Sequence, residues 1–209
     1  PANLAPSILS LLEHDPLIKN LLFKKNFTRS FKEVNLIINK INKLQVLHHL
    51  MRVCPLPDLR FERLFINIRS FVLKNLNNIE TSPELIYFLS TLSLQCFTNE
   101  YVYFEKDDDT KLIKNLETEI MRTIAKSRQP EAKKILCLAS YRPLHQYNWC
   151  KKLETLDNFK DLKSRLIEEP NAEKTIMTKI PSLGDISDNV SRKVKAQYEQ
   201  NPYPRWVKT

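Results

Sequence analysis

Histidines and cysteines that lie close together in the sequence are the first candidates for chemistry. His48 and His49 are adjacent, so on a helix they point about 100° apart and cannot ligate one metal ion together. Cys137, His145 and Cys150 share one short region and could form a thiol–imidazole pair. A reactive thiol needs an accessible, electropositive setting, and these neighbourhoods are largely apolar or aromatic. We interpret them as core cysteines beside a loop histidine, and the histidine pair as surface or packing residues.

The other candidate metal ligands also lack the spacing of a known metal-binding motif. Asp107, Asp108 and Asp109 could bind a hard cation, but the EF-hand loop needs alternating oxygens, a central glycine and a terminal glutamate. A run of acids is also typical of the positively polarised start of a helix, and we predict a helix start there. Cys54 and Cys96 complete the four cysteines, and no Cys-x-x-Cys pair occurs. We expect buried free thiols and no metal site.

The stretch QCFTNEYVYF, residues 95–104, places polar side chains between dense aromatics. Asn99 and Glu100 fall near the end of an apolar helical stripe, where carbonyl groups lose their intrahelical partners. We interpret the stretch as a buried polar cluster that caps this helix end. A binding role is the alternative.

Glycine usage excludes several enzyme classes. Gly184 is the only glycine in 209 residues. Dinucleotide-binding loops, P-loops and nucleophile elbows all need glycine, where backbone approaches phosphate or turns sharply. The chain is therefore neither a Rossmann domain, a P-loop nucleotidase nor an α/β-hydrolase, and we expect no catalytic residues in it.

The net charge of +9, from 33 Lys+Arg against 24 Asp+Glu, raises the question of a polyanionic partner. Residues 17–52 are more lopsided than the chain as a whole, with eight basic side chains against Glu33 alone. The basic residues are spread along the chain, whereas phosphate tracking needs a clustered stripe. We do not expect nucleic acid as a partner, and a basic nucleic-acid-binding domain stays a minor alternative.

Helical periodicity runs through almost the whole chain. Ser30 and Glu33 have capping-box spacing, and Asp58 precedes a stripe of apolar residues at steps of three and four. Asp15 and Ser82 each precede a proline, a common helix start. Further helices are predicted near residues 7–13, 44–52, 130–139, 159–168 and 188–200, and another after the acidic run at Asp107, with an apolar stripe from Leu112 to Ile124. No segment alternates with the period of a strand.

The predicted fold is therefore all-α, an irregular multi-helix bundle of about nine or ten helices. A solenoid-like arrangement is an alternative, although no 34-residue repeat is visible. We divide the chain into a helical domain, residues 1–186, and a linker helix with a terminal strap, residues 187–209. No apolar run could span a bilayer and no signal peptide is apparent, so we expect a cytoplasmic protein with no membrane partner. The start at Pro1, without methionine, suggests part of a longer protein.

The most distinctive stretch is NPYPRW, residues 201–206. Asn201 and Tyr203 each precede a proline, which moves both out of the helical region and makes the segment extended and stiff. Tyr203, Arg205 and Trp206 are residue types that commonly anchor interfaces or stack on flat ligands. The sequence thus predicts a strap after the last helix, although a proline-stopped helix whose aromatics pack back on the bundle fits equally well.

VSRKVKAQYEQNPYPRW resembles the linker of bacterial tetratricopeptide-repeat proteins that carry a class I S-adenosylmethionine-dependent methyltransferase domain, with the pattern V-x-x-Q-Y-E-x-N-P-Y-P-R-W. CPLPDLRFERLFINIRSFVL and LSLQCFTNEYVY resemble two further signatures of that helical region. Regular repeats before this region and the methyltransferase domain after it are both missing from the sequence. The resemblance implies a non-catalytic accessory domain that docks substrate or partner for a methyltransferase.

The resemblance also implies roles for particular residues. The linker motif is carried by Gln197, Tyr198, Glu199, Asn201, Pro202 and Pro204 together with Tyr203, Arg205 and Trp206. We expect the last three to cover the cofactor pocket of the chain's own methyltransferase domain, or to lie at the interface with it. S-adenosylmethionine would be the cofactor of the parent protein and not of these residues, and a protein is a candidate substrate. The alternative function is a stand-alone helical interaction module.

Overall fold

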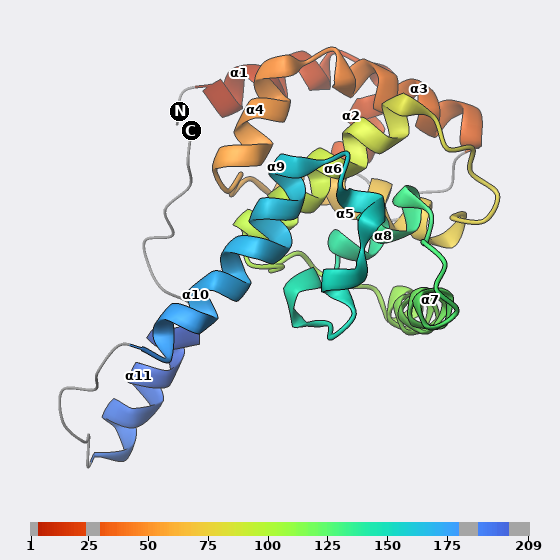
Figure 1. Cartoon of the computed structure of the whole chain (residues 1–209). Coiled ribbons are helices and arrows are strands. Elements are labelled where there is room, and N and C mark those ends of the chain that lie inside the picture. Colours follow the sequence, from red (N-terminus) through yellow and green to blue (C-terminus); the bar gives the residue numbers. More distant parts are fainter. Residues whose placement is uncertain (1–3, 24–29, 180–187, 201–209) are drawn as a thin grey trace. The chain divides into compact units, whose positions relative to one another are not determined.

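The computed structural model describes residues 4–23, 30–179 and 188–200, with side chains through Tyr198, and all regular structure in these ranges is helical (Figure 1). The chain forms two compact units, Pro1–Pro170 and Asn171–Thr209. The predicted linker, residues 187–209, lies within the second. The α-helices are α1 (Leu4–Glu13), α2 (Pro16–Phe23), α3 (Phe31–Asn42), α4 (Gln45–Val53), α5 (Leu59–Lys74), α6 (Pro83–Thr98), α7 (Asp107–Ala125), α8 (Ala132–Ala139), α9 (Lys160–Lys163), α10 (Glu169–Met177) and α11 (Asn189–Gln200).

The irregular part of the first unit lies between α8 and α10. Three short 3₁₀ turns follow α8: Leu144–Gln146, Cys150–Lys152 and Glu154–Leu156. A π-helical turn, Ser164–Glu168, joins α9 to α10 without a break, so the described residues form ten continuous helices. This confirms the predicted all-α fold.

The helix starts follow the predicted capping residues. Ser30 accepts a hydrogen bond from the Glu33 backbone while the Glu33 carboxylate accepts from the Ser30 backbone, which completes the capping box. Asp58 and Ser82 cap α5 and α6 in the same way, through the backbone N–H groups of Arg60 and Leu85. The short-range signals in the sequence therefore set these boundaries directly.

Two helices end without the glycine that usually allows a reversal of backbone twist. Glu100 after α6 and Ser127 after α7 have φ of 58° and 54°. In both places the N–H groups of this residue and of the next one donate to the last turn. Glu100 donates to Phe97 and Tyr101 to Cys96, while Ser127 donates to Ile124 and Arg128 to Thr123. These are Schellman motifs built on non-glycine residues, each of which costs about 1 kcal/mol. Other helices, such as α3 and α8, end without a residue of positive φ.

The core of the first unit is organised around α5 and α6 (Figure 1). α6 packs against α3, α4 and α8, while α5 packs against α2, α7 and α8. Contacts such as α2 with α5 and α6 with α8 join elements that are not adjacent in the sequence, as in a bundle. Burial on α5 extends beyond the predicted broad apolar stripe, because Asn67, Arg69 and Ser70 are buried too.

Candidate functional site: the segment between α6 and α7

The predicted strap falls outside the described residues. Asn201, Pro202, Tyr203, Pro204, Arg205 and Trp206 are all in this part of the chain. Gln197 and Tyr198 lie in α11 and are exposed, and Glu199 belongs to the same helix. The proposed cover for a cofactor pocket therefore stays a prediction.

The second unusual stretch of the sequence forms a well-defined feature, the α6–α7 segment, which comprises residues 99–106. It leaves α6 through two successive residues in the left-handed region, Glu100 and Tyr101 with φ of 58° and 59°. Such residues are uncommon in non-glycine positions and persist only where surrounding contacts hold them. Three sets of contacts hold this segment. The first involves Gln95 and Asn99, the second involves Arg69, and the third involves Arg142.

The first set consists of amide side chains at the end of α6. With its amide oriented so that nitrogen faces acceptors, Gln95 donates to the carbonyl oxygens of Met51 (2.8 Å) and Cys54 (3.2 Å). Its oxygen accepts from the Leu56 N–H at 3.2 Å. The hydroxyl of Tyr103 lies between the amide oxygens of Gln95 and Asn99, at 3.3 and 3.2 Å. One buried glutamine thus forms hydrogen bonds with the end of α4, with the turn after it and with the α6–α7 segment.

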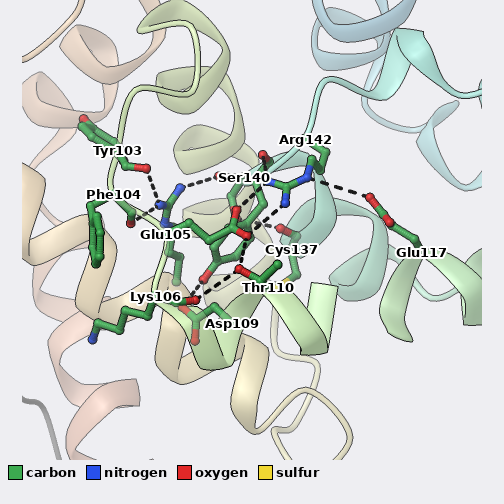
Figure 2. Close-up of polar contacts among 12 residues, drawn as sticks. Tyr103, Phe104, Glu105, Lys106, Asp109, Thr110, Glu117, Cys137, Ser140 and Arg142 are labelled. Atoms are coloured by element: carbon green, nitrogen blue, oxygen red, sulfur yellow. Dashed lines mark hydrogen bonds and ion pairs between the residues drawn. The ribbon is translucent and has the colours of Figure 1, made fainter. Parts of the chain in front are cut away.

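Arg69 on α5 is the second contact, and it is the largest fully buried side chain among the described residues. Its guanidinium group donates to the carbonyl oxygens of Tyr103 (3.0 Å) and Phe104 (2.8 Å), and to that of Ser140 at the end of α8 (2.9 Å). Figure 2 shows these carbonyl groups converging from two segments. The planar, five-donor guanidinium group suits such a junction, because a lysine cannot reach several acceptors in a plane.

An acid and two tyrosines surround this buried cation. The guanidinium carbon lies 4.3 Å from the centroid of the Tyr141 ring and 5.7 Å from that of Tyr103. The Tyr141 hydroxyl donates to Asp109 (3.2 Å), which also accepts from Ser70 at 2.9 Å. Asp109 therefore has a structural role at the start of α7, as predicted from the acidic run.

The third set fixes the end of the segment to α7 and α8. Arg142 donates two hydrogen bonds to the carboxylate of Glu105, at 2.6 and 3.0 Å, and Thr110 donates to the same carboxylate at 2.7 Å (Figure 2). The hydrogen bonds from the Arg142 guanidinium group are the largest cause of the lowered pKa of Glu105. Glu117 on α7 accepts from Tyr147 and lies 3.9 Å from Arg142. The hydrogen bonds from Arg142 and Thr110 favour the ionised form of Glu105, in line with its lowered pKa.

This cluster of side chains has a structural role, and its buried thiol and phenol groups are not reactive nucleophiles. Burial raises the pKa of the Tyr103 and Tyr141 hydroxyls above their usual range, and that of the Cys96 and Cys137 thiols to about 11 and about 12. Such thiols stay protonated and inert at neutral pH. The described residues also contain no group of three or more His, Cys, Asp or Glu side chains arranged to hold a metal ion.

The structure confirms the interpretation of these residues as core cysteines and as packing or surface histidines. Cys96, Cys137 and Cys150 are buried free thiols, and Cys54 is partly buried. His145 packs edge-on against Phe97, with ring centroids 6.4 Å apart. His48 is buried between Thr91, at 3.0 Å, and the ring of Tyr87, whereas His49 is exposed.

Sequence reasoning missed Arg69 and the outward side of the α6–α7 segment. The sequence signal for Arg69 is weak, namely a cation next to Ile68 in the second half of α5, where apolar side chains are in the majority. Val102 and Phe104 are 74% and 64% exposed, while Tyr103 between them is buried. The favoured prediction was a buried polar cluster, with a binding role as the alternative, and the segment has an exposed apolar face as well.

Basic residues do form one shallow feature, away from this segment. An open hollow of about 540 Å³ on α7 is lined by Arg122, Lys126 and Arg128, with Asn115, Thr118, Glu119 and Thr123. Cations in the last turn of a helix complement its partial negative charge, which accounts for these three without a ligand.

Comparisons with protein-family models, with curated proteins and with solved structures found no match for this chain. No helix in the described ranges combines the length and the apolar character that a membrane span requires.

Proposed function

We propose that this chain is a non-catalytic helical docking domain of an S-adenosylmethionine-dependent methyltransferase, and that α11 with the strap after it contacts the catalytic domain. The observation that carries the proposal is the exposed apolar side of α11. Val190, Val194 and Tyr198 are 68%, 44% and 64% exposed. They recur at intervals of four residues, which places them on one side of the helix.

An isolated helix of this length is unstable in water. α11 has 12 residues, whereas helices shorter than about 12–15 residues are marginal without tertiary packing. Arg192, Lys193 and Lys195 supply the polar sides. Because the helix is amphipathic and its described side chains are exposed, a partner surface is what would stabilise it. The motif that follows it in the sequence supplies the candidate, namely a methyltransferase domain directly after the strap.

Tyr203, Arg205 and Trp206 would then lie at the catalytic domain, over its cofactor pocket or at the interface. A proline-stiffened strap loses little conformational entropy when it docks, so its aromatic side chains contribute most of their contact energy to the interface. The described residues do not suit the cofactor, because they contain no strand and no glycine-rich loop. S-adenosylmethionine would be held by the catalytic domain alone.

The gene itself gives the first test. Its reading frame should continue past Thr209 into a domain with a glycine-rich loop after its first strand, and a stop codon directly after Thr209 would contradict the proposal. Calorimetry should show S-adenosylhomocysteine binding to the full-length gene product and none to residues 1–209. Absence of binding to both would equally contradict it.

Variants of the full-length protein separate the two contacts. Replacing Tyr203, Arg205 and Trp206 together by alanine should raise the dissociation constant of S-adenosylhomocysteine at least about tenfold, the equivalent of about 1.4 kcal/mol. Replacing Val190 and Val194 by serine should expose the strap to proteolysis while cofactor affinity changes less. Lys193→Ser on a polar side of α11 is the matched control, and equal effects of all three changes would argue against a specific interface.

A stand-alone interaction module is the second candidate. The exposed side chains of Val102 and Phe104, on a segment held by buried contacts, favour it. This surface belongs to the first unit and is independent of α11.

A further inference from the structure

We propose that the exposed face of the α6–α7 segment binds the exposed face of α3 in a second copy of this chain, head to tail. The donor surface consists of Val102 and Phe104 with the acids Glu100 and Asp107 on either side. The acceptor surface consists of Lys32, Leu36, Asn39 and Lys43. Both surfaces lie in the first unit and neither depends on the proposed methyltransferase role.

The donor surface has the properties of a preorganised anchor. Val102 and Phe104 are exposed, whereas Tyr103 between them is buried in the core. Their backbone is held by Arg69 at the Tyr103 and Phe104 carbonyl groups. Figure 2 shows the Phe104 ring directed away from the polar contacts that hold its own carbonyl group. A segment that is already ordered loses little conformational entropy on binding, which favours association.

The backbone of the segment supports the same interpretation. Two consecutive non-glycine residues, Glu100 and Tyr101, adopt the left-handed conformation. This arrangement costs about 1–2 kcal/mol per residue, and such local strain clusters at functional segments. A turn selected for stability alone would carry glycine or asparagine at Glu100.

The acidic residues that flank the donor surface indicate what kind of surface it would bind. Glu100, Asp107 and Asp108 are exposed and flank the two apolar residues in the sequence. Asp108 pairs with Lys74 at 3.7 Å, whereas Asp107 has no ion-pair partner among the described residues. The complementary surface is an apolar side chain between cations. The overall charge of +9 makes such an acidic edge distinctive on this molecule.

α3 presents this complementary pattern. Lys32, Leu36, Asn39 and Lys43 recur at i, i+4, i+7 and i+11, which places them in one exposed row with Leu36 between two lysines. Neither lysine side chain has an ion-pair partner in the described part of the chain. The buried row of the same helix, Val34, Ile37, Ile38 and Ile41, faces the core. The chain thus carries both halves of one complementary contact.

The two surfaces do not cover each other within one molecule, because Leu36, Val102 and Phe104 are 44%, 74% and 64% exposed. Contact between them therefore joins two copies and leaves one surface free at each end, so that the assembly grows or closes into a ring. The small apolar area makes it weak and reversible.

Sedimentation velocity tests the assembly directly. The protein of residues 1–209 should show a weight-average sedimentation coefficient that rises with concentration up to about 0.5 mM, a range in which weak contacts become populated. The rise should diminish between 50 and 500 mM NaCl, because the flanking charges are solvent-exposed and screened. A concentration-independent monomer at both salt concentrations would overturn the proposal.

Complementation gives the sharper experiment. The variants V102S/F104S and L36S should each be monomeric, because each lacks one half of the contact. A mixture of the two should form dimers that grow no further, because one intact donor surface and one intact acceptor surface remain. L59S, which removes an exposed leucine elsewhere, is the control and should assemble like the original chain. A monomeric mixture, or assembly by either variant alone, would show that these surfaces do not bind each other. All substituted positions are exposed, and unchanged thermal unfolding verifies the fold of each variant.

Discussion

The guanidinium carbon of Arg69 lies 4.3 Å from the centroid of the Tyr141 ring, and the hydroxyl of the same tyrosine donates to buried Asp109. Tyr141 therefore links a buried cation to a buried anion through its ring face at one side and its hydroxyl at the other. Three backbone carbonyl groups complete the environment of Arg69. This arrangement joins α5, the α6–α7 segment, α7 and the end of α8.

We expect Arg69→Met to destabilise the fold by about 4 kcal/mol, because three buried carbonyl groups would lose their donor. Arg69→Lys should recover only part of this, since one ammonium group cannot reach all three acceptors. Arg63→Met on the same helix, where the side chain is partly exposed, should change stability by about 0.5 kcal/mol or less. Urea unfolding followed by circular dichroism measures all three. Equal effects at positions 69 and 63 would contradict the role given to Arg69.

Gln95→Leu should cost about 3 kcal/mol, because it leaves the carbonyl groups of Met51 and Cys54 and the N–H of Leu56 without partners in the core. The apolar replacement is similar in size, so the loss reports on hydrogen bonding more than on packing. Gln146→Leu at an exposed position is the matched control. Amide hydrogen exchange at Leu56 should accelerate in the first variant only. Protection of that amide in both variants would show that another group satisfies it.

Ser127→Gly should stabilise the protein by about 0.5–1 kcal/mol, because glycine adopts the positive φ of this position without steric cost. The Schellman hydrogen bonds from Ser127 and Arg128 to the end of α7 would be retained. Ser127→Ala keeps the Cβ atom and should bring no such gain. The urea midpoint at constant slope measures the difference. A midpoint that is unchanged or lower in the glycine variant would disprove the conformational argument.

Stability should fall as the pH is lowered from about 6.5 to about 4, because His48 is buried in its neutral form. Burial lowers its pKa to about 4, and the nearby Arg52 cation contributes in the same direction. In the unfolded chain the imidazole has a pKa of about 6.5, so the unfolded state binds the proton first and folding loses free energy below that pH. The loss approaches about 3 kcal/mol when His48 is fully protonated, since one pKa unit corresponds to about 1.4 kcal/mol.

The contribution of His48 can be isolated by comparing unfolding free energies at several pH values in two variants. His48→Gln should flatten the dependence between pH 6.5 and 4, whereas His49→Gln at the neighbouring exposed position should leave it intact. An unchanged slope in the His48 variant would assign the pH dependence to other groups.

Local sequence determined the helices of this protein and most of their starts. Capping residues such as Ser30, Asp58 and Ser82 act within one turn, and apolar periodicity is a property of neighbouring positions, so both can be recognised without the fold. The same holds for the absence of catalytic motifs that need glycine. The strap residues Tyr203, Arg205 and Trp206 and the methyltransferase role remain predictions.

Only the tertiary structure decided which polar residues are buried and what holds the α6–α7 segment. Arg69 meets Ser140, and Gln95 meets Met51 and Cys54, across separations of more than 30 residues that no local pattern encodes. A buried cation is stable only where distant segments supply acceptors together, so its position depends on the packing of α5 against α7 and α8. The same packing turns Tyr103 inward, and it thereby leaves Val102 and Phe104 exposed on the surface.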